Sequence, residues 1–350
     1  MQRRLLSDLP LDQALAHGVY SLSGKLLLPQ GAKLTQRILQ VLVRWGIAEV
    51  YLEGAPEETA ISQRGSEAPV PTVPKPTSQA YRKAVGEIKR AMESLRLGEA
   101  VALTDVGRTC GNLVLSIAQD PDVLTYLHLL HYRDDYTFQH SVRVGVLAVL
   151  LGRWLRLPLA EQAQLAIAGS MHDVGKALIP LEILNKPGRL SEPEFQVVKT
   201  HPLAGHHLLS NTSGCSGMVA RVALEHHERI DGSGYPHGVS RQETILASRI
   251  VAVADIYDAM TSDRVYRSGQ PEYAVLAQLQ EDGFSTLDPQ VTRVFVEHLV
   301  YSAHGRPVTL SDGRQGRVVF SRKDDPAHPI VAVGADLVDL CRHRHLSLVR

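Results

Sequence analysis

The sequence predicts a mainly α-helical protein with a small mixed α/β module at its N-terminus and a small antiparallel β appendage at its C-terminus. Over residues 80–304, apolar residues recur at helical spacing, with charged residues between them. A sharp shift to proline and small polar residues at 54–79 separates this region from residues 1–53. Over residues 305–350 the apolar period becomes that of strands, and Asp312-Gly313 is a strong hairpin signal.

Residues 1–53 are expected to form the mixed module. Residues 19–28 are typical of two short strands turned at Ser23-Gly24. Thr35 can N-cap a helix that runs to Trp45, and residues 48–52 can return as a strand. This module has no catalytic constellation, so packing or sensing is its expected role, and residues 54–79 are expected to form a linker.

The central region is expected to consist of helices, the first of which carries Tyr81, Ala84, Ile88 and Met92 on one face. Further helices are predicted at residues 100–118, 137–155, 159–172, 192–209, 218–227, 246–261, 271–281 and 289–301. In the appendage, strands are predicted at residues 308–310, 317–320, 330–333 and 346–349.

Composition excludes several classes of function. Lysine plus arginine and aspartate plus glutamate both number 37, and zero net charge argues against a nucleic-acid or anionic-membrane partner. The three cysteines are far apart and odd in number, which fits a reducing cytosol. The apolar run 144–152 is too short to span a bilayer, and the N-terminus lacks a signal-peptide pattern. A cytoplasmic protein is therefore expected.

Histidine is the compositional excess, with 16 in the chain. Seven candidate metal ligands lie at helix ends or on apolar helix faces: His140, His172, Asp173, His201, His226, His227 and Asp255. Burying the carboxylate of Asp255 in the apolar run 250–256 would be costly, and a cation would remove that cost. Imidazole and carboxylate together suit iron, manganese or zinc. Any one such histidine is more often a core or surface residue, and only the whole set of seven indicates a metal site.

The ordered set His140, His172-Asp173 and Asp255 resembles the ligand set of the HD superfamily of metal-dependent phosphohydrolases. Residues 183–190, 201–202, 226–236 and 254–264 are similar to one branch, the HD-GYP domain of bacterial cyclic di-GMP phosphodiesterases. The resemblance covers residues 125–301 and implies an HD-type helical bundle core. Residues 1–53 resemble, less specifically, a module often attached to such domains.

The resemblance implies two divalent metal ions per chain, iron by preference and manganese as the alternative. One metal would be held by His140, His172, Asp173 and Asp255, and the other by Asp173, His201, His226 and His227. Asp173 would then be a catalytic bridge, and the two metals would share a hydroxide that attacks phosphorus. The expected reaction is hydrolysis of cyclic di-GMP to pGpG, to GMP, or to both.

Some family members carry a glutamate four residues before the first histidine, and it helps to hold a third metal. Here that position is Tyr136, on the same helix face as His140. A phenol with a pKa near 10 is a poor substitute for a carboxylate. Two metals are therefore expected, with Tyr136 near the site but not bound to a metal.

The substrate contacts implied by the resemblance begin with Lys176, three residues after Asp173, which would place a cation on the phosphate oxygens. Without the family, a surface lysine at a helix end is the commoner case. Tyr235 of the GYP signature would contact the ligand, and Gly232 and Gly234 would let the loop approach the phosphates. A purely structural turn is the alternative.

Arg264 and Arg267 match family positions that bind phosphate or guanine, and arginine suits either group. Asp258 and Asp263 are expected to be supporting or capping groups. Signalling proteins bound through the N-terminal module and a homodimer are further possible partners.

Two other functions stay open at this stage. One is a low-turnover receptor for cyclic di-GMP or a partner protein, against which the intact set of seven ligands argues. The other is an HD phosphohydrolase for another cyclic nucleotide. Gly234-Tyr235-Pro236 favours a cyclic dinucleotide, while the guanine preference rests on resemblance alone.

Overall fold

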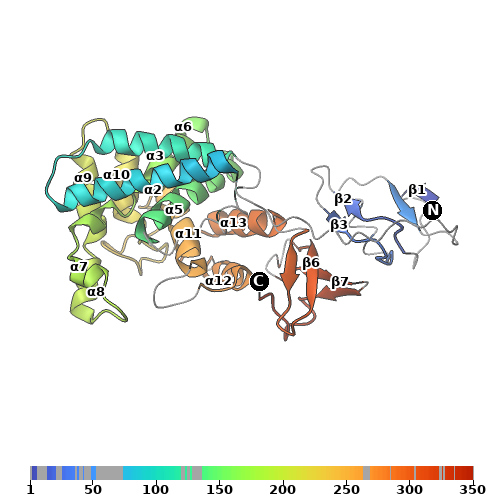
Figure 1. The fold of residues 1–350 in the computed structure, drawn as a ribbon. Coiled ribbons are helices and arrows are strands. Elements are labelled where there is room, and N and C mark those ends of the chain that lie inside the picture. Colours follow the sequence, from blue (N-terminus) through green and yellow to red (C-terminus); the bar gives the residue numbers. More distant parts are fainter. Residues whose placement is uncertain are drawn as a thin grey trace. The chain divides into compact units, whose positions relative to one another are not determined.

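The computed structural model describes residues 2–5, 14–20, 26–35, 38, 42, 49–52, 74–119, 123, 127, 136–262, 269–283, 285–302, 305–322, 325, 328–334 and 336–349. The chain divides into two compact units. The helical unit comprises Pro71–Gln270 and Gln278–Val296, and the mixed unit comprises Met1–Val70, Pro271–Ala277 and Glu297–Arg350. Figure 1 shows the helices and the strands. The predicted fold class is confirmed.

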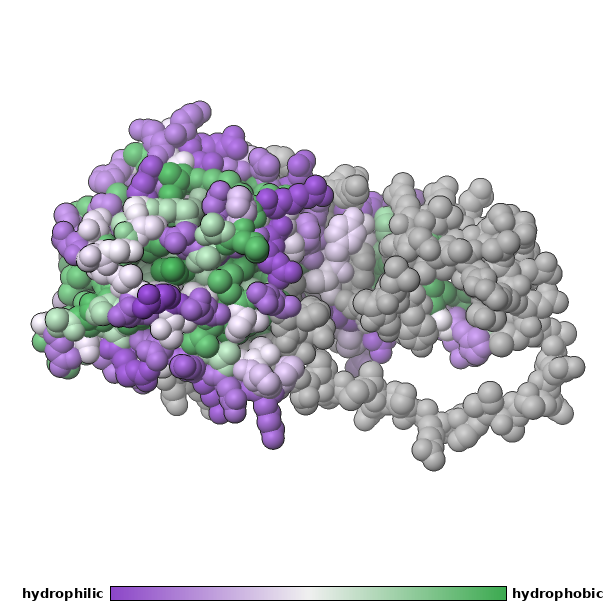
Figure 2. All heavy atoms as spheres, turned by 90° about the horizontal axis from the view of Figure 1, so that it is seen from above, coloured by the Kyte–Doolittle hydropathy of each residue, from purple (hydrophilic) through white to green (hydrophobic). Residues whose placement is uncertain are grey.

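The helical unit is built around α5 (Tyr136–Trp154), whose residues from Gln139 to Gly152 are all buried. Its neighbours are α2 (Lys75–Arg96), α3 (Leu103–Ala118), α6 (Leu159–Met171) and α11 (Leu246–Thr261). A helix buried on every side forms the centre of a bundle. Figure 2 shows polar and apolar residues interspersed over one face of this unit. Among the described residues, no helix combines the length and the apolar character needed to cross a lipid bilayer.

Two glycines bring α5 and α6 close together. A Cβ on Gly169 would lie 2.7 Å from the Cα of Gly145, and one on Gly145 would lie 2.6 Å from Oγ of Ser170. Larger side chains at either position would therefore push the helices apart. This contact holds the start of α5, with His140, beside the end of α6, which His172 and Asp173 follow.

The single helix predicted over residues 192–209 is wrong, because two helices occupy these residues: α8 (Glu192–Val198) and α9 (His201–Ser210). Pro202 explains the break, since proline has no N–H to donate to the carbonyl of Val198 four residues earlier. That carbonyl lies instead 2.7 Å from Nδ1 of His201. The helix break thus orients a candidate metal ligand.

The remaining elements of the helical region include a short 3-10 helix, Val174–Leu178, and α7 (Leu181–Leu184). Helices α10 (Gly217–Glu225), α12 (Glu272–Asp282) and α13 (Pro289–Ser302) follow along the chain. Neither α7 nor α8 has a buried residue, and both project from the bundle in Figure 1.

The mixed unit contains antiparallel sheets. Strand β1 (Gln2–Leu5) pairs with β4 (Glu49–Leu52), and β2 (Val19–Tyr20) pairs with β3 (Leu26–Leu28). The third sheet has the order β5 (Pro307–Thr309), β6 (Gln315–Phe320), β7 (Ile330–Val333) and β8 (Asp336–Asp339). The predicted hairpin is confirmed as β5–β6. The turn predicted at residues 23–24 and most of the helix predicted over 35–45 lie outside the described residues.

The strand predicted at residues 346–349 is wrong. Leu346 and Leu348 are buried, which explains the alternating pattern, but Leu348 forms only an isolated bridge with Leu310. The fourth strand is β8, which the sequence did not predict because aspartates begin and end it.

The N-terminal residues and the C-terminal sheet share one hydrophobic core. It consists of Leu15, Val19, Leu28, Ala32, Leu34, Ile38, Leu42, Val319, Ile330 and Ala332. Strands β6 and β7 therefore bury apolar side chains against segments from the far end of the sequence. The domain boundaries predicted at residues 53, 79 and 304 stay predictions.

Deleting residues 1–53 is expected to destabilise the C-terminal sheet, because Val319 and Ile330 would lose their apolar partners. Burial of one such side chain contributes roughly 1.5–3 kcal/mol. We expect faster amide hydrogen exchange in β6 and β7 of the truncated protein, with the amides of α5 and α11 still protected. Unchanged exchange in β6 and β7 would mean that the sheet is stable without this cover.

Candidate metal centre and active site

The structure brings all seven predicted ligands together from separate elements. His140 comes from α5, His172 and Asp173 follow α6, and His201 begins α9. His226 and His227 follow α10, and Asp255 lies in α11. Their potential ligand atoms form two compact groups: Asp173, His201, His226 and His227 in one, and His140, His172 and Asp255 in the other. Within each group these atoms lie within 4.8 Å of one another.

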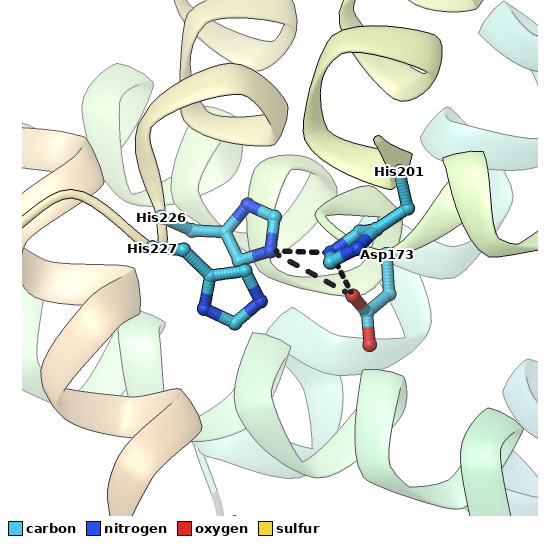
Figure 3. Close-up of side chains that lie close together, drawn as sticks. All are labelled: Asp173, His201, His226 and His227. Carbon is cyan, nitrogen blue, oxygen red and sulfur yellow. Dashed lines mark hydrogen bonds and ion pairs between the residues drawn. The ribbon is translucent and has the colours of Figure 1, made fainter. Parts of the chain in front are cut away.

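Asp173 faces both groups with different oxygens. Its Oδ1 lies 3.2 Å from Nε2 of His201 and 3.7 Å from Nε2 of His226 (Figure 3). Its Oδ2 lies 3.4 Å from Nε2 of His172 and 3.8 Å from Nε2 of His140. The side chain is 1% exposed. This is the geometry that a bridging carboxylate requires, while the ligand role itself stays a proposal.

Backbone carbonyls fix the ring orientation of three histidines. Nδ1 lies 2.7 Å from the Gly169 carbonyl in His172, 2.7 Å from that of Val198 in His201, and 2.9 Å from that of Ala223 in His226. A carbonyl only accepts, so each Nδ1 carries the hydrogen and donates it. In a neutral ring, each Nε2 is then a lone-pair acceptor directed into the site.

The resulting cluster of acceptors fits a metal. Nε2 of His201 and Nε2 of His226 lie 3.2 Å apart, and neither carries a hydrogen when both rings are neutral. Nε2 of His172 and Oδ1 of Asp173 are buried without a hydrogen-bond partner. Buried unsatisfied acceptors are costly, and a divalent cation would satisfy several of them at once.

His140 is oriented by a carboxylate instead. Its Nδ1 lies 2.8 Å from Oδ2 of Asp258, and its Nε2 lies 3.1 Å from Oδ1 of Asp255. Arg143 donates from Nε to Oδ1 of Asp258 at 2.6 Å and from Nη2 to Oδ2 at 3.0 Å. The supporting role predicted for Asp258 matches this placement, since partners of this kind orient metal-binding histidines.

Helices α10 and α11 are tied together next to the site by Glu225, which is buried. Its Oε2 accepts from the Ile245 N–H at 3.1 Å and from Oγ of Ser248 at 2.8 Å. Glu225 immediately precedes His226 and His227, and Ser248 lies in α11, the helix that carries Asp255. The hydrogen bonds of Glu225 therefore fix the position of the two histidines relative to Asp255.

Protonation differs between the two groups. Burial lowers the pKa of His226 to about 4 and lowers the pKa of His227 well below its usual value. Burial also opposes the charged form of His140, but hydrogen bonds to Asp255 and Asp258 outweigh it and raise its pKa to about 9. Burial would raise the pKa of Asp173, yet Lys176 and the neighbouring histidines hold it well below its usual value.

Metal affinity of the His140 group is therefore expected to depend on pH. Because the pKa of His140 is raised to about 9, its ring is protonated on both nitrogens at pH 7, and a metal that binds Nε2 must displace one of these protons. Affinity for Mn²⁺ should rise by about tenfold per pH unit between pH 6.5 and 8.5, with one proton released. Anaerobic calorimetry in two buffers of different ionisation enthalpy measures both quantities. An affinity independent of pH, with no proton release, would contradict this reading.

A cavity of about 690 Å³ is lined in part by members of both ligand groups. This volume is typical of small-molecule sites. Its lining includes the predicted Lys176 and Tyr235, and also Tyr136, which was expected near the site. It further includes Asn185, Lys186 and Arg229. A site role for Arg229 was not predicted, because an arginine in a polar loop is usually a solvated residue.

Lys176 and Tyr235 each lie against a metal-ligand candidate. Nζ of Lys176 is 2.5 Å from Oδ2 of Asp173. The Tyr235 ring stacks on His227 with ring centroids 4.6 Å apart, and Nζ of Lys199 lies 5.4 Å from the Tyr235 centroid. Both predicted substrate contacts are thus positioned at the junction of the ligand groups and the cavity.

Gly234 has a packing reason to be glycine. A Cβ there would lie 2.5 Å from the backbone of residues 227–229, so the loop can fold tightly only without one. Gly234 is not among the residues that line the cavity, and its contact with substrate stays a prediction. Arg264 and Arg267 lie outside the described residues.

A helical bundle with these buried histidine and carboxylate groups defines a metal-dependent phosphohydrolase of the HD type. The family model described as HD domain matches residues 126–291. A cyclic di-GMP phosphodiesterase of Pseudomonas aeruginosa is 35% identical over 303 residues, covering 81% of this chain and 73% of the relative. The chain belongs to the HD-GYP family of cyclic di-GMP phosphodiesterases, which implies binding of divalent metal, and its histidine and aspartate cluster is able to hold such an ion.

Two further comparisons bear on specificity and on fold. A 3'3'-cGAMP-specific phosphodiesterase of Vibrio cholerae is 33% identical over 59% of this chain, which spans 47% of that relative. The solved structure of an HDG"Y"P protein from Bdellovibrio bacteriovorus aligns with a TM-score of 0.54 at 17% identity. That alignment covers 85% of this chain and 99% of the other, and it supports the fold alone.

Proposed function

We propose that this protein hydrolyses cyclic di-GMP to pGpG, to GMP, or to both, in the cavity above the two ligand groups. The observation that carries the proposal is the convergence of seven metal-ligand candidates, with unpartnered acceptors, beneath a cavity of about 690 Å³. The named activity of the Pseudomonas relative supports cyclic di-GMP as the substrate.

We assign the seven candidates to two metal sites. His140, His172 and Asp255 would hold one divalent ion, His201, His226 and His227 would hold a second, and Asp173 would be shared by both. When bound, two such ions polarise a phosphodiester and lower the pKa of the attacking water. Iron is the preferred metal and manganese the alternative, because both accept imidazole with carboxylate.

The chain itself supplies order and charge around the reacting phosphate. Carbonyl-bound Nδ1 atoms hold three imidazoles rigidly, so little reorganisation is needed when substrate binds. Lys176, which is 21% exposed and lines the cavity, would bind a non-bridging phosphate oxygen while it remains beside Asp173. Addition of water across one P–O3′ bond opens the ring to pGpG, and a second addition gives two GMP.

Hydrolysis of 3'3'-cGAMP is the second candidate function, because a relative with 33% identity is named for that activity. Both substrates have two phosphodiesters and at least one guanine, so the metal groups would treat them alike. Contacts to the bases in the outer cavity would decide between them.

A direct assay tests the proposal. Purified protein, loaded anaerobically with iron or manganese, is incubated separately with cyclic di-GMP and 3'3'-cGAMP, and the products are resolved by chromatography. We expect metal-dependent release of pGpG or GMP, with cyclic di-GMP as the better substrate. Tight binding without turnover would indicate a receptor, and preferred turnover of 3'3'-cGAMP would favour the second candidate.

Metal content is expected to be two equivalents per chain. The position of Tyr136 supports this number, because its ring stacks on His140 with centroids 5.9 Å apart and an angle of 11° between the planes. A neutral phenol in this position offers no carboxylate for a third ion. Plasma mass spectrometry of the anaerobically loaded protein measures the ratio, and three equivalents would contradict the expectation.

A further inference from the structure

Two lysines and one arginine among the described residues line the cavity: Lys176, Lys186 and Arg229. The two lysines are already paired with carboxylates. Nζ of Lys176 lies 2.5 Å from Asp173, and Nζ of Lys186 lies 2.6 and 2.7 Å from the two carboxylate oxygens of Glu194. Arg229 differs from both, and its binding capacity is largely unused.

The guanidinium of Arg229 donates from Nη1 to the backbone carbonyl of Glu228 at 2.9 Å. Within the described part of the chain, no carboxylate forms an ion pair with it. A guanidinium has five N–H donors in a planar fork, so four remain for a ligand in the cavity.

The loop that carries Arg229 is held by its own hydrogen bonds. The Gly232 N–H donates to the Arg229 carbonyl at 2.9 Å, and the Tyr235 N–H donates to the His227 carbonyl at 3.2 Å. The Glu228 carboxylate, which is buried, accepts from the backbone N–H groups of residues 237 and 239 at 2.8 and 3.1 Å. Arg229 therefore extends from a fixed backbone, which favours specific recognition.

An aromatic side chain lines the cavity together with this cation. Tyr235 follows Arg229 by six residues in the same loop, and both residues belong to the cavity lining. The Tyr235 ring also stacks on the ring of His227. Neither Arg229 nor Tyr235 is among the metal-ligand candidates, and a flat aromatic ring together with a planar donor fork in one cavity suits a nucleobase better than the reacting phosphate.

We infer that Arg229 reads the O6/N7 edge of one guanine of the bound cyclic dinucleotide and thereby sets base specificity. Guanine presents two acceptors on this edge, which match the arginine fork, whereas adenine presents one acceptor and one donor. The inference rests on the proposed function, because it takes a cyclic dinucleotide as the ligand of this cavity.

The test combines a protein change with a base change. kcat/KM is measured for Arg229→Ala and the wild type, with cyclic di-GMP and with its analogue in which 7-deazaguanine replaces both guanines. In the wild type, removal of N7 should lower kcat/KM by about tenfold or more. Arg229→Ala should lower kcat/KM for cyclic di-GMP by about tenfold to a hundredfold and respond little to the loss of N7.

Two controls accompany these measurements. Arg108→Ala removes an exposed arginine of α3 that is paired with Asp105, and it should match the wild type with both ligands. Arg229→Lys keeps the charge without the fork and should behave like Arg229→Ala. Metal content and melting temperature should be unchanged in all three variants.

Equal loss of activity toward both ligands in Arg229→Ala would overturn the inference, since it would indicate a phosphate or structural role. Full activity of Arg229→Lys toward cyclic di-GMP would overturn it too. If the wild type binds cyclic di-GMP without turnover, the proposed function fails, and the same comparison is made with dissociation constants.

Discussion

Asp173→Ala is expected to abolish turnover and to lower the metal content of the protein more than any other single substitution. Asp173 lies between the two ligand groups, with one oxygen near His201 and His226 and the other near His172 and His140. Its removal would take a ligand from both metals at once. Because outer partners of metal ligands already account for roughly 10–100-fold in affinity or activity, a shared ligand should account for more.

The measurements are kcat with cyclic di-GMP and metal equivalents per chain after anaerobic loading. Asp105→Ala is the control, since that carboxylate is exposed on α3 and pairs with Arg108. Circular dichroism should show that both variants fold, because Lys176 can reach solvent when its partner is removed. Wild-type turnover in Asp173→Ala would contradict the two-metal mechanism.

Asp258→Asn is expected to lower metal affinity by about 10–100-fold, although Asp258 is not a proposed ligand. Asp258 accepts from Nδ1 of His140 and from two nitrogens of Arg143. An asparagine has one acceptor oxygen and no charge, so it cannot hold His140 and compensate the buried Arg143 together. Saturating metal should restore much of the turnover, which a purely structural defect would not allow.

Loss of a buried ion-pair partner also destabilises the fold, by roughly 3–5 kcal/mol, so a matched control is needed. Asp288 is a buried carboxylate that pairs with Arg241 and Arg249 at 3.0 and 2.9 Å and does not line the cavity. Both variants should show a lower melting temperature, while Asp288→Asn keeps wild-type metal affinity. Equal affinities in the two variants would show that Asp258 does not orient His140.

Much of the site could be predicted from the sequence because its ligands occupy helix ends and apolar faces, where polar residues need a reason. The orientation of those ligands could not be predicted from the sequence. The Val198 carbonyl that orients His201 is free only because Pro202 interrupts the helix, and a continuous helical pattern concealed that break. A side-chain pattern contains no information about which backbone carbonyls are free to accept. Which ring nitrogen of each histidine is hydrogen-bonded could therefore be learned only from the three-dimensional structure.

The fold was predictable to a similar degree. Helices such as α5 and α11 were expected near their observed bounds. Strand β8 was missed because its aspartates mask its apolar pair, and the shared core of the mixed unit joins segments from opposite ends of the chain. Arg229 was missed for another reason: only the cavity distinguishes it from a solvated loop arginine.

Anomalous diffraction from crystals of the iron-loaded protein, recorded on both sides of the iron absorption edge, tests the proposed metal centre most directly. Two peaks are predicted, one among His201, His226 and His227 and the other among His140, His172 and Asp255, with Asp173 in contact with both. A single peak, a third peak at Tyr136, or peaks outside these seven residues would contradict the account.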